Sequence, residues 1–299
     1  MELANLAAFV AVAEHGGFSA AAEALHLSQP AVSKRIALLE SQWQARLFDR
    51  IGRQVILTEA GQALLPRARR ILAELDDTRQ LLDTLGSDVG GTLRLATSHH
   101  IGLHRLPGLL RSFIARHPAV SLDLRFLDSE QAWDDVLQGK VDLAVTTLGP
   151  ASPPLLAVPV WDDPLEIVVA PDHPLASARN VTLADIAEHP AVLPDANTFT
   201  HRIVADVFHQ HGLSLGLRMT SNAMETLKML VSIGLAWSAL PHALIDEQVV
   251  VLRIPGLRLQ RRLGYVRHDR RTQSNAARAF MALLDAEAGG SGTQGIQPK

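Results

Sequence analysis

The sequence contains no cysteine among its 299 residues. Disulfide bonds, thiolate catalysis and cysteine-based redox sensing are therefore excluded. It also contains no apolar run long enough to cross a bilayer, and it does not begin with a basic segment followed by an apolar one. From these absences we expect a cytoplasmic protein with no membrane partner.

Motifs typical of several enzyme classes are missing as well. The sequence has no Gly-rich phosphate loop, no nucleophile elbow and no His-Glu-x-x-His segment. His99, His100 and His104 resemble a metal site, because residues 100 and 104 would share one face of a helix. No matching carboxylate stands near them, so we expect no metal, no cofactor and no enzymatic activity.

The charge is unevenly distributed along the chain. The net charge is −3, but residues 31–70 contain eight basic residues against three acidic ones, an excess of +5 that leaves −8 for the rest. A basic region on an acidic protein is typical of a surface presented to phosphate groups. The basic residues of this region are Lys34, Arg35, Arg46, Arg50, Arg53, Arg67, Arg69 and Arg70.

Residues 18–40, which read FSAAAEALHLSQPAVSKRIALLE, predict two helices separated by a tight turn at 26–27. Ser19 is placed to cap the first helix and Ser28 to cap the second. Pro30 falls in the first turn of the second helix, where its missing N–H costs nothing. Two short helices with this turn are typical of a helix-turn-helix, although an ordinary helical hairpin can show the same pattern.

The second of these helices has an apolar stripe formed by Val32, Ile36 and Leu39. Its other faces carry the polar residues Gln29, Ser33 and Lys34. In a helix-turn-helix the start of this helix meets base edges in the major groove. Glutamine can pair with adenine there, and lysine with guanine or phosphate.

The flanking segments favour DNA binding. A helix over 3–14 precedes the motif, and residues 49–57 predict a two-stranded wing that turns at 52–53 and carries Arg50 and Arg53. We expect Arg53 to reach the DNA backbone or a minor groove. A long helix begins after Thr58, which is placed to cap it, and Pro66 should kink it near its start. Its apolar residues, spaced alternately by four and three, predict a coiled-coil seam between two copies of the chain: Leu64, Ala68, Ile71, Leu75, Thr78, Leu82 and Leu85.

Strands and helices alternate after Gly90–Gly91, which predicts a mostly parallel sheet with helices on both faces. The expected elements include a helix over 106–116 and strands over 143–147, 165–170 and 191–193. A break at 150–154 divides this part into two lobes of similar size with a ligand cleft between them. The expected fold class is therefore α/β, preceded by an all-α winged helix-turn-helix. The expected domains are 1–58 for DNA binding, 59–89 for the linker helix, 90–288 for the two-lobed effector domain and 289–299 for a disordered tail.

Hydroxyl-rich segments end strands in both expected lobes. Ligands of α/β sheets bind beyond the carboxyl ends of strands, and helix N-termini there bind anions. We therefore expect a small anionic effector, although threonine is also common at strand ends for purely structural reasons, and Glu225 would oppose an anion. The candidate effector-binding residues are Thr97, Ser98, His99, His100, Thr146, Thr147, Thr198, Phe199, Thr200, Met224 and Trp237.

Several motifs together resemble the LysR-type transcriptional regulators. They are AFVAVAEHGGFSAAAEALHLSQPAVSKRIALLE, LFDR and LTEAG, followed by the looser matches DLAVTT and GLAWSALP. The resemblance implies a winged helix-turn-helix, a homodimer through the linker helix and an effector domain similar to periplasmic binding proteins. It further implies promoter DNA as a partner, a small-molecule inducer, often a homotetramer, and RNA polymerase as a further candidate partner. Trp237 departs from the family, which more often has a smaller aliphatic residue there.

We accordingly expect a bacterial transcriptional regulator. A pure solute-binding protein would explain residues 90–288 but not the helix-turn-helix before them. The candidate DNA-binding residues, of which the resemblance carries over positions 29, 30, 33, 34 and 53, are Ser28, Gln29, Pro30, Ser33, Lys34, Arg35, Arg50 and Arg53.

Overall fold

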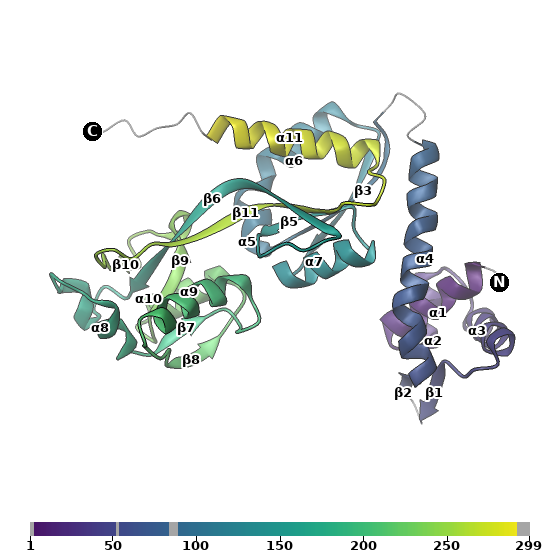
Figure 1. The fold of residues 1–299 in the computed structure, drawn as a ribbon, viewed down its shortest axis with the longest axis horizontal. Coiled ribbons are helices and arrows are strands. Elements are labelled where there is room, and N and C mark those ends of the chain that lie inside the picture. Colours follow the sequence, from purple (N-terminus) through teal and green to yellow (C-terminus); the bar gives the residue numbers. More distant parts are fainter. Residues whose placement is uncertain (1–2, 52–53, 84–88, 292–299) are drawn as a thin grey trace. The chain divides into compact units, whose positions relative to one another are not determined.

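The computed structural model describes residues 3–51, 54–83 and 89–291 (Figure 1). The chain divides into two compact units, the first comprising residues 1–86 and the second nearly all of the rest. Within the described ranges, no helix combines the length and the apolar character needed to cross a lipid bilayer.

The first unit is a winged helix-turn-helix, as predicted. Its elements before the linker are α1 (Leu3–His15), α2 (Phe18–Ala24), α3 (Gln29–Trp43), β1 (Phe48–Ile51) and β2 (Gln54–Leu57). The two strands pair antiparallel and form the wing. The predicted cap at Ser19 is wrong, because α2 begins at Phe18 and its N-cap is Gly17, two residues before Ser19. The buried ring of Phe18 belongs to the first turn of this helix.

The linker helix α4 spans Glu59–Asp83 and continues through Pro66. Thr58 caps it as predicted, since its Oγ1 accepts the N–H of Gly61 at 3.1 Å. The helix start lies against the wing so closely that a Cβ at Gly61 would lie 2.2 Å from the carbonyl oxygen of Leu47. Only glycine fits this contact.

The first half of the predicted seam packs on its own unit rather than on a partner. Ala68 is fully buried in the core of the helix-turn-helix, and Leu64 packs against the same core. Arg69 Nε also donates to Glu14 Oε1 on α1 at 2.9 Å. Farther along the helix, Ile71 is 40% exposed and remains available to a partner. The side chain of Leu82 and the whole of Leu85 lie outside the described residues.

The second unit is built on a seven-stranded sheet in the order β10-β6-β11-β5-β3-β4, with β9 beside β6. Within this sheet, only β3 pairs in parallel, with β4 and β5, whereas β6 and β11 run antiparallel to each of their neighbours. The expected mostly parallel sheet is therefore wrong. The strands are β3 (Gly91–Thr97), β4 (Val120–Phe126), β5 (Leu143–Thr147), β6 (Leu155–Val169), β9 (Ser238–Pro241), β10 (Val250–Val251) and β11 (Leu259–His268).

The long strands β6 and β11 carry the chain out of the first lobe and back into it (Figure 1). The second lobe is thus an insertion in the first. Sequence reasoning missed the first ten residues of β6 because Pro159 and Pro164 cannot donate to a strand ladder. The partner strand adapts at Gly264, which faces Pro159 where the register shifts. A Cβ at Gly264 would lie 2.1 Å from the carbonyl oxygen of Val158.

Helices cover both faces of the sheet in the first lobe, as predicted. Ile101, Phe113 and Phe280 pack on one face, and Trp133 packs on the other. The last helix runs on to Ser291, so residues 289–291 are not the expected disordered tail. Its apolar face stays packed on the lobe as far as Ala288, and residues 292–299 lie outside the described ranges. These helices are α5 (His99–His104), α6 (Leu106–Arg116), α7 (Ser129–Gln138) and α11 (Asn275–Ser291).

The second lobe packs around Trp237, whose ring stacks on Phe208 with centroids 5.4 Å apart. The indole Nε1 donates to the carbonyl oxygen of His189 at 3.0 Å. The remaining elements of this lobe are η1 (Pro174–Ser177), α8 (Leu183–Ala187), β7 (Ala191–Leu193), α9 (Phe199–Gln210), β8 (Leu217–Thr220), α10 (Met224–Ser232) and η2 (His242–Leu244).

Candidate functional site

The first candidate site is the exposed start of α3. Ser28 Oγ accepts the N–H of Ala31 at 3.4 Å and caps the helix. The apolar stripe of α3 is fully buried, whereas Gln29, Pro30 and Lys34 are exposed and Ser33 is half-buried. The predicted orientation of this helix is therefore confirmed.

The wing adds a positive charge to this unit. The guanidinium of Arg50 lies 4.2 Å from the centre of the Phe18 ring, a cation–π contact that orients an otherwise exposed side chain. Arg35 on α3 is half-buried. Arg53, which was predicted to act from the wing tip, lies outside the described residues.

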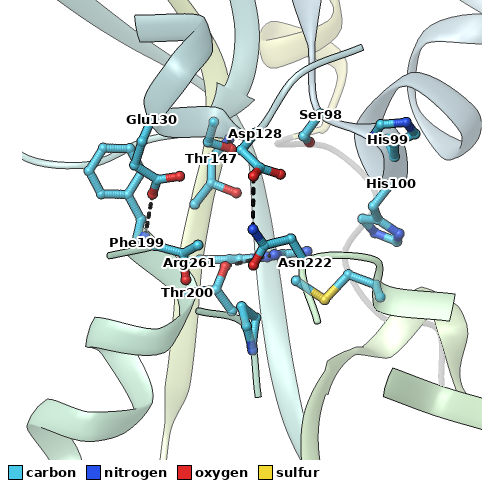
Figure 2. A pocket seen from close by; sticks show the side chains of 14 residues that line it. Ser98, His99, His100, Asp128, Glu130, Thr147, Phe199, Thr200, Asn222 and Arg261 are labelled. Carbon is cyan, nitrogen blue, oxygen red and sulfur yellow. Dashed lines mark hydrogen bonds between the residues drawn. The ribbon is translucent and has the colours of Figure 1, made fainter. Parts of the chain in front are cut away.

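The second candidate site is a pocket between the two lobes (Figure 2). Its cavity of about 50 Å³ leaves room for only a few water molecules. The pocket is lined by eight of the predicted effector residues, which are Ser98, His99, His100, Thr147, Thr198, Phe199, Thr200 and Met224.

Three predicted effector residues face elsewhere. Thr97 Oγ1 donates to the carbonyl oxygen of Val145 at 2.8 Å, and Thr146 Oγ1 accepts the indole N–H of Trp133 at 3.0 Å. Thr146 and Thr147 are neighbours on one strand, so their side chains point to opposite faces and only Thr147 reaches the pocket. Trp237 is 1% exposed and belongs to the core of the second lobe.

Two acidic residues that sequence reasoning missed connect the lobes across the pocket (Figure 2). Asn222 Nδ2 donates to Asp128 Oδ2 at 2.8 Å. The N–H of Phe199, at the start of α9, donates to Glu130 Oε1 at 2.5 Å. Glu130 therefore occupies the helix start at which an anion was expected. Burial raises the pKa of this carboxyl, against the opposing effect of its hydrogen bonds.

The pocket also contains Arg261, a buried cation that sequence reasoning missed (Figure 2). Its Nη1 donates to Thr200 Oγ1 at 3.1 Å. Its Nε donates to Asp163 Oδ2 at 2.6 Å. Its Nη2 is buried and has no hydrogen-bond partner among the described residues. One signal could have revealed it, because residues 259, 261 and 263 share the buried face of β11 and the middle one is charged. The other missed lining residues are Ser129 and Pro194.

His100 lies at the edge of this pocket and is 4% exposed. Burial, followed by the nearby charge of Arg261, lowers the pKa of His100 to about 4. Its ring is therefore neutral at pH 7, and it adds no positive charge for an anion. The only fixed cation lining the pocket is Arg261, among the residues that the structure describes.

Comparison with known proteins matches both parts of the chain to known domains. Residues 3–62 match the bacterial regulatory helix-turn-helix protein family of the lysR type, and residues 86–289 match the LysR substrate binding domain. A RuBisCO operon transcriptional regulator of Allochromatium vinosum is 32% identical over 295 residues, covering 96% of this chain and 97% of that protein. An HTH-type transcriptional regulator from the ibpB-leuC intergenic region of Azotobacter vinelandii is 71% identical over 107 residues, which are 36% of this chain and 74% of that protein.

The fold is also similar to that of solved structures. Full-length CbnR, crystallised with its target DNA, aligns with a TM-score of 0.67 at 24% identity and covers 96% of this chain and 100% of that one. The two matched domains together span almost the whole described chain. The chain therefore belongs to the LysR family and is a ligand-responsive, DNA-binding transcriptional regulator rather than an enzyme.

Proposed function

We propose that this regulator reads promoter DNA through the start of α3 and supports that contact from the wing. The observation that carries the proposal is the capped start of α3, which exposes Gln29 and Lys34 while the opposite stripe is buried. Glutamine at this position can pair with a base, and the basic residues can contact phosphates. The proposed contact residues are Ser28, Gln29, Pro30, Ser33, Lys34, Arg35, Arg50 and Arg53.

The experiment begins with an operator selected by the protein from a pool of random DNA duplexes. Affinity is then measured at rising salt concentrations on the operator and on random DNA. Lys34→Ala should weaken binding to the operator and to random DNA by a similar factor. It should also reduce the slope of the logarithm of affinity against the logarithm of salt concentration by about 1. Arg253→Ala, which removes an exposed arginine of the second unit, is the matched control and should change nothing. An unchanged slope for Lys34→Ala would exclude a phosphate contact at this residue.

We also propose that two copies of the chain associate through the second half of α4. Ile71 is 40% exposed there, and Leu75 is half-buried, although each is apolar. Ile71→Asp together with Leu75→Asp would bury charge in a seam and should convert a dimer to a monomer in sedimentation. An unchanged mass would contradict the proposal. We further propose that the protein forms tetramers, contacts RNA polymerase and is located in the cytoplasm.

For the effector we propose a small anion held between the lobes. The observation that carries this is the unpartnered Nη2 of buried Arg261 in the pocket. Asp128 and Glu130 line the same pocket, so their charges favour a ligand of low total negative charge. A ligand that contacts both lobes binds the closed form more tightly than the open form, and this difference shifts the equilibrium between them.

A thermal-shift screen of small carboxylates, phosphate and sulfate against the full chain tests this proposal. Ser98→Ala should then weaken the best ligand about tenfold to a hundredfold, while DNA affinity without ligand stays unchanged. Ser177→Ala on η1, outside the pocket, is the control. If Ser98→Ala and Thr200→Ala both bind the ligand like the parent, the effector pocket lies elsewhere.

A further inference from the structure

Three potential metal ligands meet at the edge of the inter-lobe pocket. His100 and His104 are one turn apart on α5, and their ring centres are 4.9 Å apart. Glu225 reaches them from the first turn of α10 in the other lobe. Its Oε1 lies 3.2 Å from His104 Nε2 and 3.9 Å from His100 Nδ1. One ligand atom from each of the three residues lies within 4.8 Å of the other two.

These distances are close to those of a metal site. Zinc binds nitrogen and oxygen at about 2.0–2.1 Å in a tetrahedral arrangement, which places neighbouring ligand atoms about 3.3 Å apart. The contact of His104 with Glu225 already has this length, and the contact of His100 with Glu225, at 3.9 Å, requires only a small closure. Two histidines four residues apart with one carboxylate are also a donor set typical of zinc.

A second and independent observation is the state of His100. Its side chain is 4% exposed, yet neither ring nitrogen has a hydrogen-bond partner among the described residues. A buried polar atom without a partner is costly, and an ion is one of the few things that explain it. A simple hydrogen bond between His104 and Glu225 accounts for those two residues but leaves His100 unexplained.

We propose that His100, His104 and Glu225 bind a divalent transition-metal ion of the zinc type across the two lobes. The sequence predicted no metal because no carboxylate stands near the histidines, but the fold supplies one from 121 residues beyond His104. His104 and Glu225 are about two-fifths exposed, which gives the ion a path from solvent.

Metal binding of this kind favours the closed arrangement of the lobes. The open form can offer the two histidines or the carboxylate but not all three, so the ion binds the closed form more tightly. Three protein ligands leave one position for water. An oxygen of the proposed anionic effector could take that position, a step that rests on the proposed function, whereas binding of the ion itself does not.

The test uses the full chain freed of metal by a chelator and titrated with Zn²⁺ in a calorimeter. The parent should bind one ion per chain at this site. His104→Ala and Glu225→Gln should each weaken this binding by at least about tenfold, since each removes one ligand. His242→Ala is the matched control, because His242 also faces a carboxylate, Glu166, at 3.6 Å, but the described part of the chain places no third ligand beside this pair. It should leave the binding unchanged.

Co²⁺ absorption provides a second readout that loss of fold cannot imitate. The visible bands of the parent complex should change in Glu225→Gln while the metal-free melting temperatures of the two proteins agree. The proposal is overturned if the parent binds no Zn²⁺, or if both variants bind it like the parent. It is equally overturned if only His104→Ala loses the ion, because the site would then be confined to the first lobe. None of these outcomes depends on the identity of the organic effector.

Discussion

The exposed start of α3 and the inter-lobe pocket are assembled in opposite ways. The surface of α3 is built from residues that are neighbours in the sequence, and its polar side chains are exposed. The pocket brings together residues from position 98 to position 261, from two lobes, and several of its polar side chains are buried. A local pattern is therefore enough to find the first site, whereas the second depends on tertiary pairings.

The same difference determines what each site should tolerate. If α3 reads DNA as proposed, replacing one of its exposed side chains removes a contact to DNA and costs the fold little. A buried polar group of the pocket is part of the folding core, so its replacement changes stability as well as binding. Variants whose stability and binding are measured separately test this difference between the two sites.

The largest effect is expected from Arg261→Met. This change leaves the buried carboxylate of Asp163 without its main partner, which lies 2.6 Å away in the parent. Breaking a buried pair on one side costs about 3–5 kcal/mol in the free energy of unfolding. Urea denaturation of the second unit, followed by tryptophan fluorescence, measures the loss.

Two further variants test whether the loss of stability comes from the unpaired charge or from the change of side chain on the strand. Arg262→Met changes the exposed neighbour on the same strand and should stay within about 0.5 kcal/mol of the parent. Adding Asp163→Leu to Arg261→Met should restore much of the stability, because no buried charge remains unpaired. If Arg261→Met alone is as stable as the parent, the ion pair of Arg261 with Asp163 does not stabilise the folded second unit.

A smaller effect is expected from Gly61→Ala in the first unit. The new methyl group would lie 2.2 Å from the backbone oxygen of Leu47, which cannot move without shifting the wing. Overpacking of this kind costs about 1–3 kcal/mol in the free energy of unfolding. Gln62→Ala, at the exposed next residue, is the control for thermal unfolding. Equal melting temperatures for the two variants would show that the wing and α4 are not in close contact.

The smallest effect is a pH dependence that comes from Glu130. Burial raises the pKa of its carboxyl above the ordinary 4.5. The stability that it contributes is therefore complete below the unfolded pKa and is lost as pH rises through the raised folded pKa. Glu130→Gln keeps an acceptor for the N–H of Phe199 but cannot ionise.

Thermal unfolding of the parent and of Glu130→Gln between about pH 4 and pH 8 checks this prediction. The variant should gain stability relative to the parent as pH rises, and the gain should then level off. Glu188→Gln, at an exposed carboxyl, should show no such trend. If the difference in thermal stability between the parent and Glu130→Gln stays constant over the whole pH range, the folded structure does not disfavour the charged form of Glu130.

Periodicity in the sequence predicts which residues are buried but not which residues they meet. It located α6 at 106–116, β5 at 143–147 and β7 at 191–193 with the bounds that the structure has. It failed at β6, where two prolines interrupt the strand pattern and Gly264 compensates on the partner strand. The antiparallel pairings of β6 and of its partner β11 were missed with it, so a mixed sheet was predicted as mostly parallel.

The candidate pocket shows the same limit. Hydroxyl-rich strand ends identified Ser98 and Thr200, because that signal is local. Asp128 and Glu225 were not found as partners, because each meets a residue far away in the sequence, Asn222 and His104 respectively. Only Arg261 carried a readable signal, as a charge on the buried face of a strand.

The most direct test of the central claim, that the start of α3 reads base sequence, is the affinity of Gln29→Ala for the selected operator and for random DNA. Both are measured at one salt concentration by fluorescence anisotropy. We predict a loss of about 1–3 kcal/mol in binding free energy on the operator and almost none on random DNA, because a bidentate pair with a base exists only on the operator. Equal losses on both DNAs, or no loss on the operator, would contradict the claim that this helix reads the sequence.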